Sequence, residues 1–208
     1  MWFSIAIASF FLLSLAAVID KFLLTKTRVA PLAFAFYIAL GGIIGSALLF
    51  FEPRFYFPDA RLLWILFLGG AGLFFGLYFM FKAVEVSEVS KANPLIVSLT
   101  PLAVWLLSFG LGLELVTWQK ILGIAVLLAG GYFLSQVGQN RARVTKLAWL
   151  FIGLASFLLG LSNVLSKIAY QEMPFISSFV WLRWFTLLAA VIVVAGLGRW
   201  AEIFLTNH

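Results

Sequence analysis

Of the 208 residues in the chain, 64% are hydrophobic and 11% are charged, whereas soluble domains carry about 45–50% apolar and about 25% charged residues. This composition excludes an ordinary water-soluble protein, and the absence of cysteine excludes disulfides, thiolate metal sites and thiol catalysis. The net charge of +6 is spread between apolar runs rather than gathered on one face, so we expect a lipid bilayer, and not a nucleic acid, as the partner.

Seven apolar runs follow one another along the chain, each about as long as the roughly twenty residues that cross a bilayer as a helix. In order, they are 3–24, 30–51, 62–82, 92–112, 118–137, 147–169 and 175–196. Short polar segments between them predict turns, and Asn93 and Pro94 are expected to mark the start of the fourth helix. The pattern predicts an all-α, polytopic transmembrane bundle of about seven spans, without a separate soluble domain.

One segment of the chain is copied. The sequence FLLSLAAVIDK at 11–21 aligns with FLLGLSNVLSK at 157–167, and six of the eleven positions are identical. After a gap of three residues, Pro31 aligns with Pro174 and Phe36 aligns with Phe179. The shared lysine and the proline that follows it at equal depth indicate a duplicated helical unit, which is common in transporters.

The copy divides the chain into two unequal repeats. The first, 1–138, holds five predicted helices, and the second, 147–208, holds two. An odd number of spans reverses the membrane sense of the next copy, so the second repeat is expected to be inverted relative to the first. Because it lacks three helices, we expect either a fragment of a ten-helix chain or a short form completed by another subunit, such as a second copy in a homodimer.

Short patterns in the first repeat carry a family resemblance. They are FMFKAVEVS at 79–87, NP at 93–94 with SLTPL at 98–102, LELVTWQKILG at 113–123 and AGGY at 129–132. Together they resemble the EamA-type members of the drug/metabolite transporter superfamily over nearly the whole chain, apart from the incomplete second half. The resemblance implies an integral membrane permease or exporter of small solutes in a bacterial plasma membrane, without a cofactor and without enzymatic activity.

Charges inside apolar helices cost at least about 2.5–3.5 kcal/mol each on insertion scales, so they invite a functional explanation. The candidates are Lys21, Lys82, Lys167 and Arg183. Lys21 and Lys167 each lie about one turn from a helix end, where a lysine can reach the interface along apolar surface. The alternative interpretation is that both point into a shared cavity and attract an anionic or carboxylate-bearing solute.

Arg183 lies about nine residues into the seventh helix, which is too deep to reach water easily. Trp181 and Trp184 are its neighbours in sequence, and a guanidinium stacks on aromatic rings and binds carboxylate or phosphate with two hydrogen bonds. We therefore expect these three residues to form one wall of a binding site. The alternative is a structural pairing with a helix carbonyl or with an acid elsewhere in the bundle.

The fourth helix contains a proline, Pro101, which frees the carbonyl of Val97 and predicts a kink, either a moving hinge or a static bend. Ser98 and Thr100 place hydroxyls near this kink, for the solute or for the backbone. The full candidate substrate-binding set is Lys21, Asn163, Lys167, Trp181, Arg183, Trp184, Ser98 and Thr100, with Pro101 as the hinge.

Glycines recur at intervals typical of close helix packing, as in the pairs Gly41 and Gly45 and Gly72 and Gly76. Two further glycines, at positions 69 and 70, precede the second pair. Because glycine has no side chain, these positions are expected to let two helix backbones approach each other.

A secondary transporter that moves a small metabolite by alternating access, with its site near the bilayer midplane, is the main functional hypothesis. No P-loop sequence supports direct use of ATP. An intramembrane enzyme or a light receptor is disfavoured, because there is no zinc pattern, no histidine to activate a serine and no lysine deep in the last helix. A truncated or non-transporting membrane scaffold remains the alternative.

Three properties of a transporter are left open by the residues. Amino acids, nucleobases, sugars and cationic drugs all suit an aromatic cavity with a few positive charges. The coupling ion is equally open, since Asp20 is the only acid away from a helix end. For the orientation, the excess of basic residues on one side places the N-terminus outside, whereas the resembling family usually keeps it in the cytoplasm.

Overall fold

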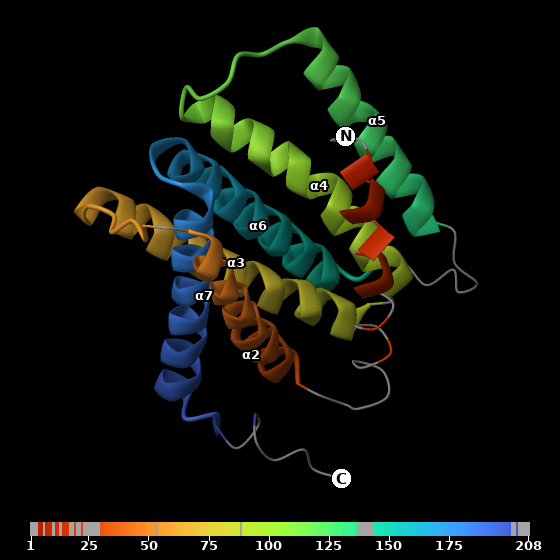
Figure 1. Ribbon diagram of the computed structural model, residues 1–208. Coiled ribbons are helices and arrows are strands. Elements are labelled where there is room, and N and C mark those ends of the chain that lie inside the picture. The colour runs from red at the N-terminus through yellow and green to blue at the C-terminus, as the bar shows by residue number, and fades with distance from the viewer. Residues whose placement is uncertain are drawn as a thin grey trace.

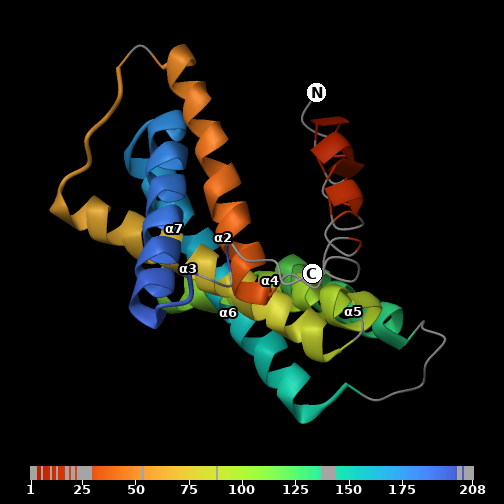
Figure 2. The same cartoon turned by 90° about the horizontal axis from the view of Figure 1, so that it is seen from below.

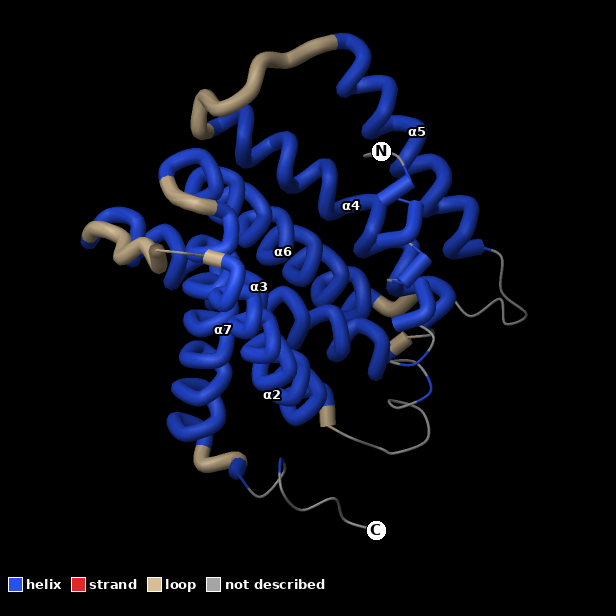
Figure 3. The backbone as a smooth tube through the Cα atoms, in the orientation of Figure 1, coloured by secondary structure: helices blue, strands red, loops and turns tan. Residues whose placement is uncertain are grey.

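The computed structural model describes residues 30–52, 54–87, 89–136, 144–200 and Ile203, together with isolated positions between 4 and 22. Its elements are α2 (Pro31–Gly41), the 3₁₀ helix η1 (Gly42–Phe51), α3 (Ala60–Val86), α4 (Val89–Gly110), α5 (Trp118–Gln136), α6 (Lys146–Glu172) and α7 (Phe175–Leu197). A shorter apolar helix, Ile7–Ala16, precedes them. All regular structure in the described part of the chain is helical (Figure 3).

The all-α, polytopic prediction is confirmed. Among the described residues, six helices are long and apolar enough to cross a bilayer, and they match the predicted runs from 30–51 to 175–196. The first predicted run, 3–24, falls largely outside the described residues. The prediction that Asn93 and Pro94 mark the start of the fourth helix is wrong, because α4 begins at Val89 and includes Pro94. Pro94 is the sixth residue of α4 and removes only the one hydrogen bond that its N–H would have donated to the Ser90 carbonyl, so the helix continues through it.

Local sequence signals determine several of the helix ends. The Asp59 carboxylate accepts a hydrogen bond from the Leu62 N–H at 2.8 Å, and the Thr145 hydroxyl accepts one from the Ala148 N–H at 3.2 Å. These side chains cap the first turns of α3 and α6. The end of α7 is closed by Gly198, which adopts a left-handed backbone conformation with φ of 63° that glycine tolerates best.

The long helices lie side by side in the order α7, α3, α6, α4, α5 (Figures 1 and 2). The central pair, α3 and α6, shares the largest contact, and α2 with η1 packs against α3 and α7. The outermost helix, α5, touches the bundle mainly through α4. Only Gly131 and Ser135 of α5 are buried, so most of its surface is left for lipid.

Glycines of α3 allow the close central packing, as predicted. A Cβ added to Gly72 would lie 3.2 Å from the Leu158 carbonyl oxygen of α6, and one added to Gly76 would lie 2.8 Å from the Leu159 side chain. Gly70 faces α7 at a similarly short range. At Gly45 the neighbour is the Phe179 ring, so this glycine makes room for a side chain and not for a second backbone. The packing prediction is wrong for Gly41, around which a Cβ would meet nothing within 4 Å.

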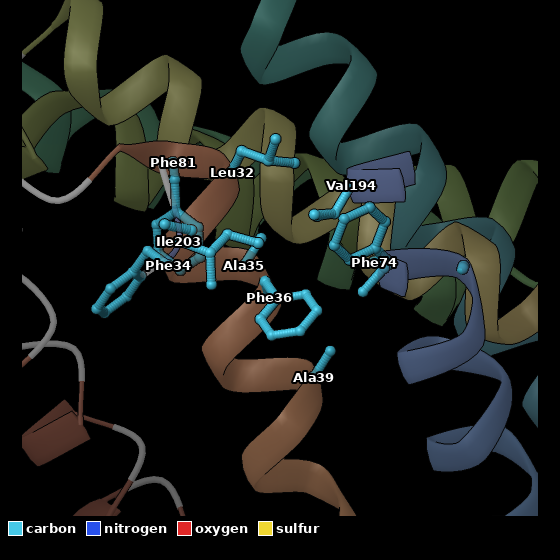
Figure 4. Packing of buried hydrophobic residues seen from close by; sticks show 12 residues of the cluster. Leu32, Phe34, Ala35, Phe36, Ala39, Phe74, Phe81, Val194 and Ile203 are labelled. Atoms are coloured by element: carbon cyan, nitrogen blue, oxygen red, sulfur yellow. The ribbon is translucent and has the colours of Figure 1, made fainter. Parts of the chain in front are cut away.

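A cluster of buried apolar side chains joins α2, α3 and α7 at one end of the bundle (Figure 4). The rings of Phe34 and Phe81 meet edge to face, with their centroids 4.6 Å apart. Phe74 is fully buried in the same cluster, beside Val194 of α7 (Figure 4). This cluster fixes α2 against the bundle and, through it, positions η1 beside α7.

Candidate functional site

A cavity of about 380 Å³ lies between α6 and α7, and we call it the polar cavity. Its polar lining consists of Ser162, Asn163, Ser166, Lys167, Tyr170, Gln171 and Arg183, and its apolar lining of Leu73, Phe179 and Leu182. Two of the polar side chains are cationic, and none of the lining residues is acidic. The cavity therefore has a net positive charge within the membrane-spanning part of the bundle.

Arg183 is a cationic side chain of this cavity that has no acidic partner among the described residues. Its guanidinium carbon lies 4.9 Å from the centre of the Phe179 ring, in a cation–π arrangement. Within the described part of the chain, no carboxylate lies within ion-pair distance, and Nε is buried without a hydrogen-bond partner. A partly buried guanidinium without an acid is costly, so an anion from outside the chain would stabilise it.

Two glycines of η1 make room for this arginine and its aromatic partner. A Cβ at Gly42 would lie 3.2 Å from Arg183 Cδ, and a Cβ at Gly45 would lie 2.6 Å from the Phe179 ring. Side chains at these positions would displace both groups. The guanidinium is therefore placed by the packing of the bare η1 backbone against the Arg183 and Phe179 side chains of α7.

Lys167 lies at the edge of the polar cavity and is ion-paired. Its ammonium donates to Glu114 Oε1 at 2.6 Å, and Lys120 donates to Glu114 Oε2 at 2.8 Å. Glu114 belongs to the turn between α4 and α5, which Gly112 allows by adopting a φ of 68°. One carboxylate thus connects α5, the α4–α5 turn and α6.

A second cavity, of about 540 Å³, lies on the other side of α6 between α4 and α5, and we call it the apolar cavity. It is lined by Thr100, Pro101, Val104, Trp105, Glu114, Lys120, Gly123, Ile124, Leu127 and Asn163. The indole Nε1 of Trp105 is buried without a hydrogen-bond partner. Asn163, in the second half of α6, lines both cavities, so the two cavities approach each other at this residue.

Comparison with known proteins identifies one family, the EamA-like transporter family, whose pattern matches residues 1–136. The chain belongs to the EamA-like transporter family. No curated protein and no solved structure matches the chain. As an EamA-like protein with six bilayer-length helices, it is an integral membrane protein of a family that transports small solutes.

The match to the EamA-like family ends with α5, so α6 and α7 lie beyond it. These two helices nevertheless supply nine of the ten residues that line the polar cavity. The matched segment contributes Leu73 of α3, the glycines of η1 and the carboxylate of Glu114. The division of this EamA-like chain into two inverted repeats stays a prediction.

The predicted site residues of this EamA-like chain fall into three groups. Asn163, Lys167 and Arg183 lie together in the polar cavity, and Thr100 and Pro101 line the apolar cavity with Asn163. Ser98 lies in neither, because it packs on Gly131 of α5 and donates to the Leu95 carbonyl at 3.0 Å. Lys21 lies outside the described residues.

The two tryptophans do not flank Arg183 as expected. The Trp181 indole donates to the Tyr56 carbonyl at 3.0 Å, and the Trp184 indole donates to the Ser46 hydroxyl at 2.9 Å. Residues one or two positions apart on a helix point in different directions, so neighbours in sequence do not share a face. The aromatic partner of Arg183 is instead Phe179, one helical turn earlier.

Several residues of this EamA-like site were not predicted, among them Glu114, Tyr170, Phe179 and Gln171. The spacing of four residues between Phe179 and Arg183 is a signal that the sequence contained. Tyr170 and Gln171 follow Lys167 within one turn and offered the same signal. Glu114 offered none, because its pairing with Lys167 joins a turn to a helix that is distant in sequence.

The ion pair of this EamA-like chain is expected to be insensitive to ordinary changes in pH. Hydrogen bonds from Lys120 and Lys167 hold the pKa of Glu114 at about 2, below its usual 4.5. A lowered carboxyl pKa gives stabilisation that is complete above the usual pKa and is lost as the pH falls through the folded one. The stabilisation that this ion pair gives to the contact between the α4–α5 turn and α6 should therefore be complete from neutral pH to about pH 4.5 and be lost progressively as the pH falls toward 2.

Distances between spin labels test this expectation. Because the chain has no cysteine, Leu115→Cys and Gln171→Cys place labels only on the turn and on the end of α6. The distance should be constant from neutral pH to about pH 4.5. Adding Glu114→Gln should remove the acid step altogether. A transition near the usual carboxyl pKa in the chain that retains Glu114 would contradict the paired geometry.

Proposed function

We propose that the chain is a secondary transporter that moves small organic anions across the membrane by alternating access. The observation that carries the proposal is Arg183, which lines the polar cavity, stacks on Phe179 and has no acidic partner among the described residues. A guanidinium presents a planar fork of N–H donors, which matches the two oxygens of a carboxylate, sulfonate or phosphate.

The surroundings of Arg183 favour an anion over the other solute classes. Lys167 adds a second cationic group to the same lining. Its partner Glu114 is shared with Lys120, so these three groups together with Arg183 still carry a net positive charge, which would repel a cationic drug. Asn163, Tyr170 and Gln171 supply amide and hydroxyl groups that can orient the rest of a polar solute. A volume of about 380 Å³ suits a small organic molecule.

Alternating access requires that the same site open to each side of the membrane in turn. Pro101 is the proposed hinge, because it interrupts the hydrogen bonding of α4 where that helix lines the apolar cavity. An inverted relation between the two repeats would supply the second conformation by exchanging the roles of equivalent helices. A driving ion is not required, because exchange of one anion for another is compatible with this site.

Counterflow into proteoliposomes tests the proposal. Benzenesulfonate, benzenesulfonamide and benzyltrimethylammonium have similar size but carry negative, no and positive charge, and the first and last keep their charge at neutral pH. We expect protein-dependent flux of benzenesulfonate at least about tenfold above that of the other two, which corresponds to roughly 1.4 kcal/mol of discrimination. Protein-free liposomes provide the background.

The alternative, a non-transporting membrane scaffold, gives a different result in the same experiment. Flux would equal that of protein-free liposomes for all three compounds, although the protein is folded and inserted. Preferred flux of the cation would reject the assigned solute class while leaving transport in place.

A further inference from the structure

We propose that the polar and apolar cavities together hold one amphipathic organic anion. Its charged head binds Arg183 and replaces Glu114 as the ion-pair partner of Lys167. Its apolar tail extends past Asn163 into the apolar cavity. The inference rests on the proposed function and adds to it the shape of the substrate and a role for Glu114.

The two cavities share one lining residue, Asn163 of α6. The side chain of Asn163 is exposed rather than packed among neighbours. Arg183 lies on the polar side of this residue, and Trp105 and Leu127 lie on the apolar side. A ligand extending past Asn163 would therefore have a cationic site at one end and an apolar wall at the other.

An ion pair crosses the same boundary. Lys167 lines the polar cavity, Glu114 lines the apolar cavity, and 2.6 Å separates the ammonium nitrogen from the carboxylate oxygen. The chain thus places its own carboxylate where the head of an anionic ligand would meet Lys167. If a ligand takes over Lys167, Glu114 still keeps Lys120, at 2.8 Å, so its charge is not left alone.

The exchange at Lys167 would couple binding to movement. The ion pair between Glu114 and Lys167 ties the α4–α5 turn to α6. When an anionic head replaces Glu114, the turn and α5 are released from α6, while Arg183 and Lys167 are both neutralised by the ligand. Glu114 is in this sense an internal competitor, which binds Lys167 whenever the solute is absent.

The lining of the apolar cavity matches a tail better than a second polar group. The Thr100 hydroxyl already donates to the Ile96 carbonyl at 2.7 Å, so it offers no free donor, and most other wall residues are apolar. A volume of about 540 Å³ exceeds that of the polar cavity. Each methylene of a tail that enters this space should raise affinity about fourfold.

Calorimetric titration of the purified chain in a maltoside detergent tests the tail. The probes are benzenesulfonate, 4-phenylbutanesulfonate and 6-phenylhexanesulfonate, which share one head and differ in reach. We expect affinity to rise with length by about fourfold per methylene once the tail enters the apolar cavity.

Gly123→Leu is designed to fill that cavity. Gly123 lines it, and a Cβ there meets nothing within 4 Å, so the larger side chain enters open space without a backbone clash. The variant should lose the gain with length and keep the wild-type affinity for benzenesulfonate, which also reports that it is folded. Gly130→Leu is the matched control, since it lies on the same helix with equally open surroundings and outside both cavities.

Glu114→Gln tests the competition at Lys167. Removing the internal carboxylate should strengthen the binding of benzenesulfonate about three- to tenfold, because the head no longer displaces an ion pair. Glu172→Gln is the control, since Glu172 pairs with Arg61 at 3.3 Å outside both cavities. Weaker binding of benzenesulfonate to Glu114→Gln would overturn the competition.

The remaining outcomes separate this inference from the proposed function. Equal affinity for all three sulfonates, or a length effect that survives Gly123→Leu, would overturn the two-cavity site and leave anion binding in place. Failure of every sulfonate to bind would overturn the proposed function itself. Binding of dihexanoyl phosphatidylglycerol, with the same loss in Gly123→Leu and without sulfonate binding, would assign the site to a lipid and overturn a free solute.

Discussion

Arg183→Gln is expected to weaken the binding of benzenesulfonate about 30-fold, which corresponds to roughly 2 kcal/mol, the usual range for hydrogen bonds to charged groups. Glutamine keeps much of the length of arginine but removes the charge and the forked donors that face the polar cavity. Arg183→Lys keeps the charge alone and should fall between, with a loss of about fivefold. Titration calorimetry of the three proteins measures the effect.

The matched control is Arg61→Gln, which removes the same charge from an exposed side chain that pairs with Glu172. It should leave benzenesulfonate binding unchanged. A similar loss in both variants would mean that the net charge of the protein, and not the geometry of Arg183, determines affinity.

The thermal stability of Arg183→Gln provides a second test of the role of this arginine. Because Arg183 has no acidic partner among the described residues, its removal breaks no ion pair. The melting temperature of Arg183→Gln should therefore equal or exceed that of the wild type. A structural arginine would behave in the opposite way, since breaking a buried pair is strongly destabilising.

Gly70→Ala is expected to destabilise the protein by about 1–3 kcal/mol, the cost of overpacking a close contact. The added Cβ would lie 2.7 Å from the Thr186 nitrogen and 2.8 Å from the Phe185 carbonyl carbon, both of which are backbone atoms of α7. Backbone within a packed helix cannot move aside as a side-chain end can. The crossing of α3 and α7 must therefore open, which thermal unfolding in detergent measures.

Gly153→Ala is the control for this substitution. Gly153 lies in α6, where a Cβ meets nothing within 4 Å, and alanine is preferred over glycine in a helix by about 0.5–1 kcal/mol. This variant should melt at or above the wild-type temperature. Equal melting temperatures for the two alanine variants would show that the close approach at Gly70 does not limit packing.

The architecture was predictable because hydrocarbon imposes a simple rule on sequence. A span must satisfy its backbone internally and present apolar side chains, so the runs from 30–51 to 175–196 could be read directly. The change from α2 to η1 at Gly42 was not predictable, because both segments are apolar and the two helix types differ only in hydrogen bonding. The start of α4 was misplaced because Pro94 was taken as a boundary although helices tolerate proline in their first turns.

The sequence predicted those residues of the candidate site that are charged although they lie within an apolar membrane span. Arg183 and Lys167 were found because a charge in an apolar run is unusual. Their partners were not, since Glu114 lies in an ordinary polar turn and Phe179 is one of 23 phenylalanines. Pairings between elements depend on how α6 packs against the α4–α5 turn, and the sequence of one segment does not contain that information.

Substitutions of the η1 glycines can change the solute preference of such a chain during evolution. Arg183 and Phe179 occupy their places because Gly42 and Gly45 present no side chain to them. A single added methyl group at Gly42 would tilt the guanidinium fork relative to its ligand without altering any charge. Substitution of a glycine in η1, which does not itself line the polar cavity, can therefore change which solutes are bound while the residues that line the cavity stay the same.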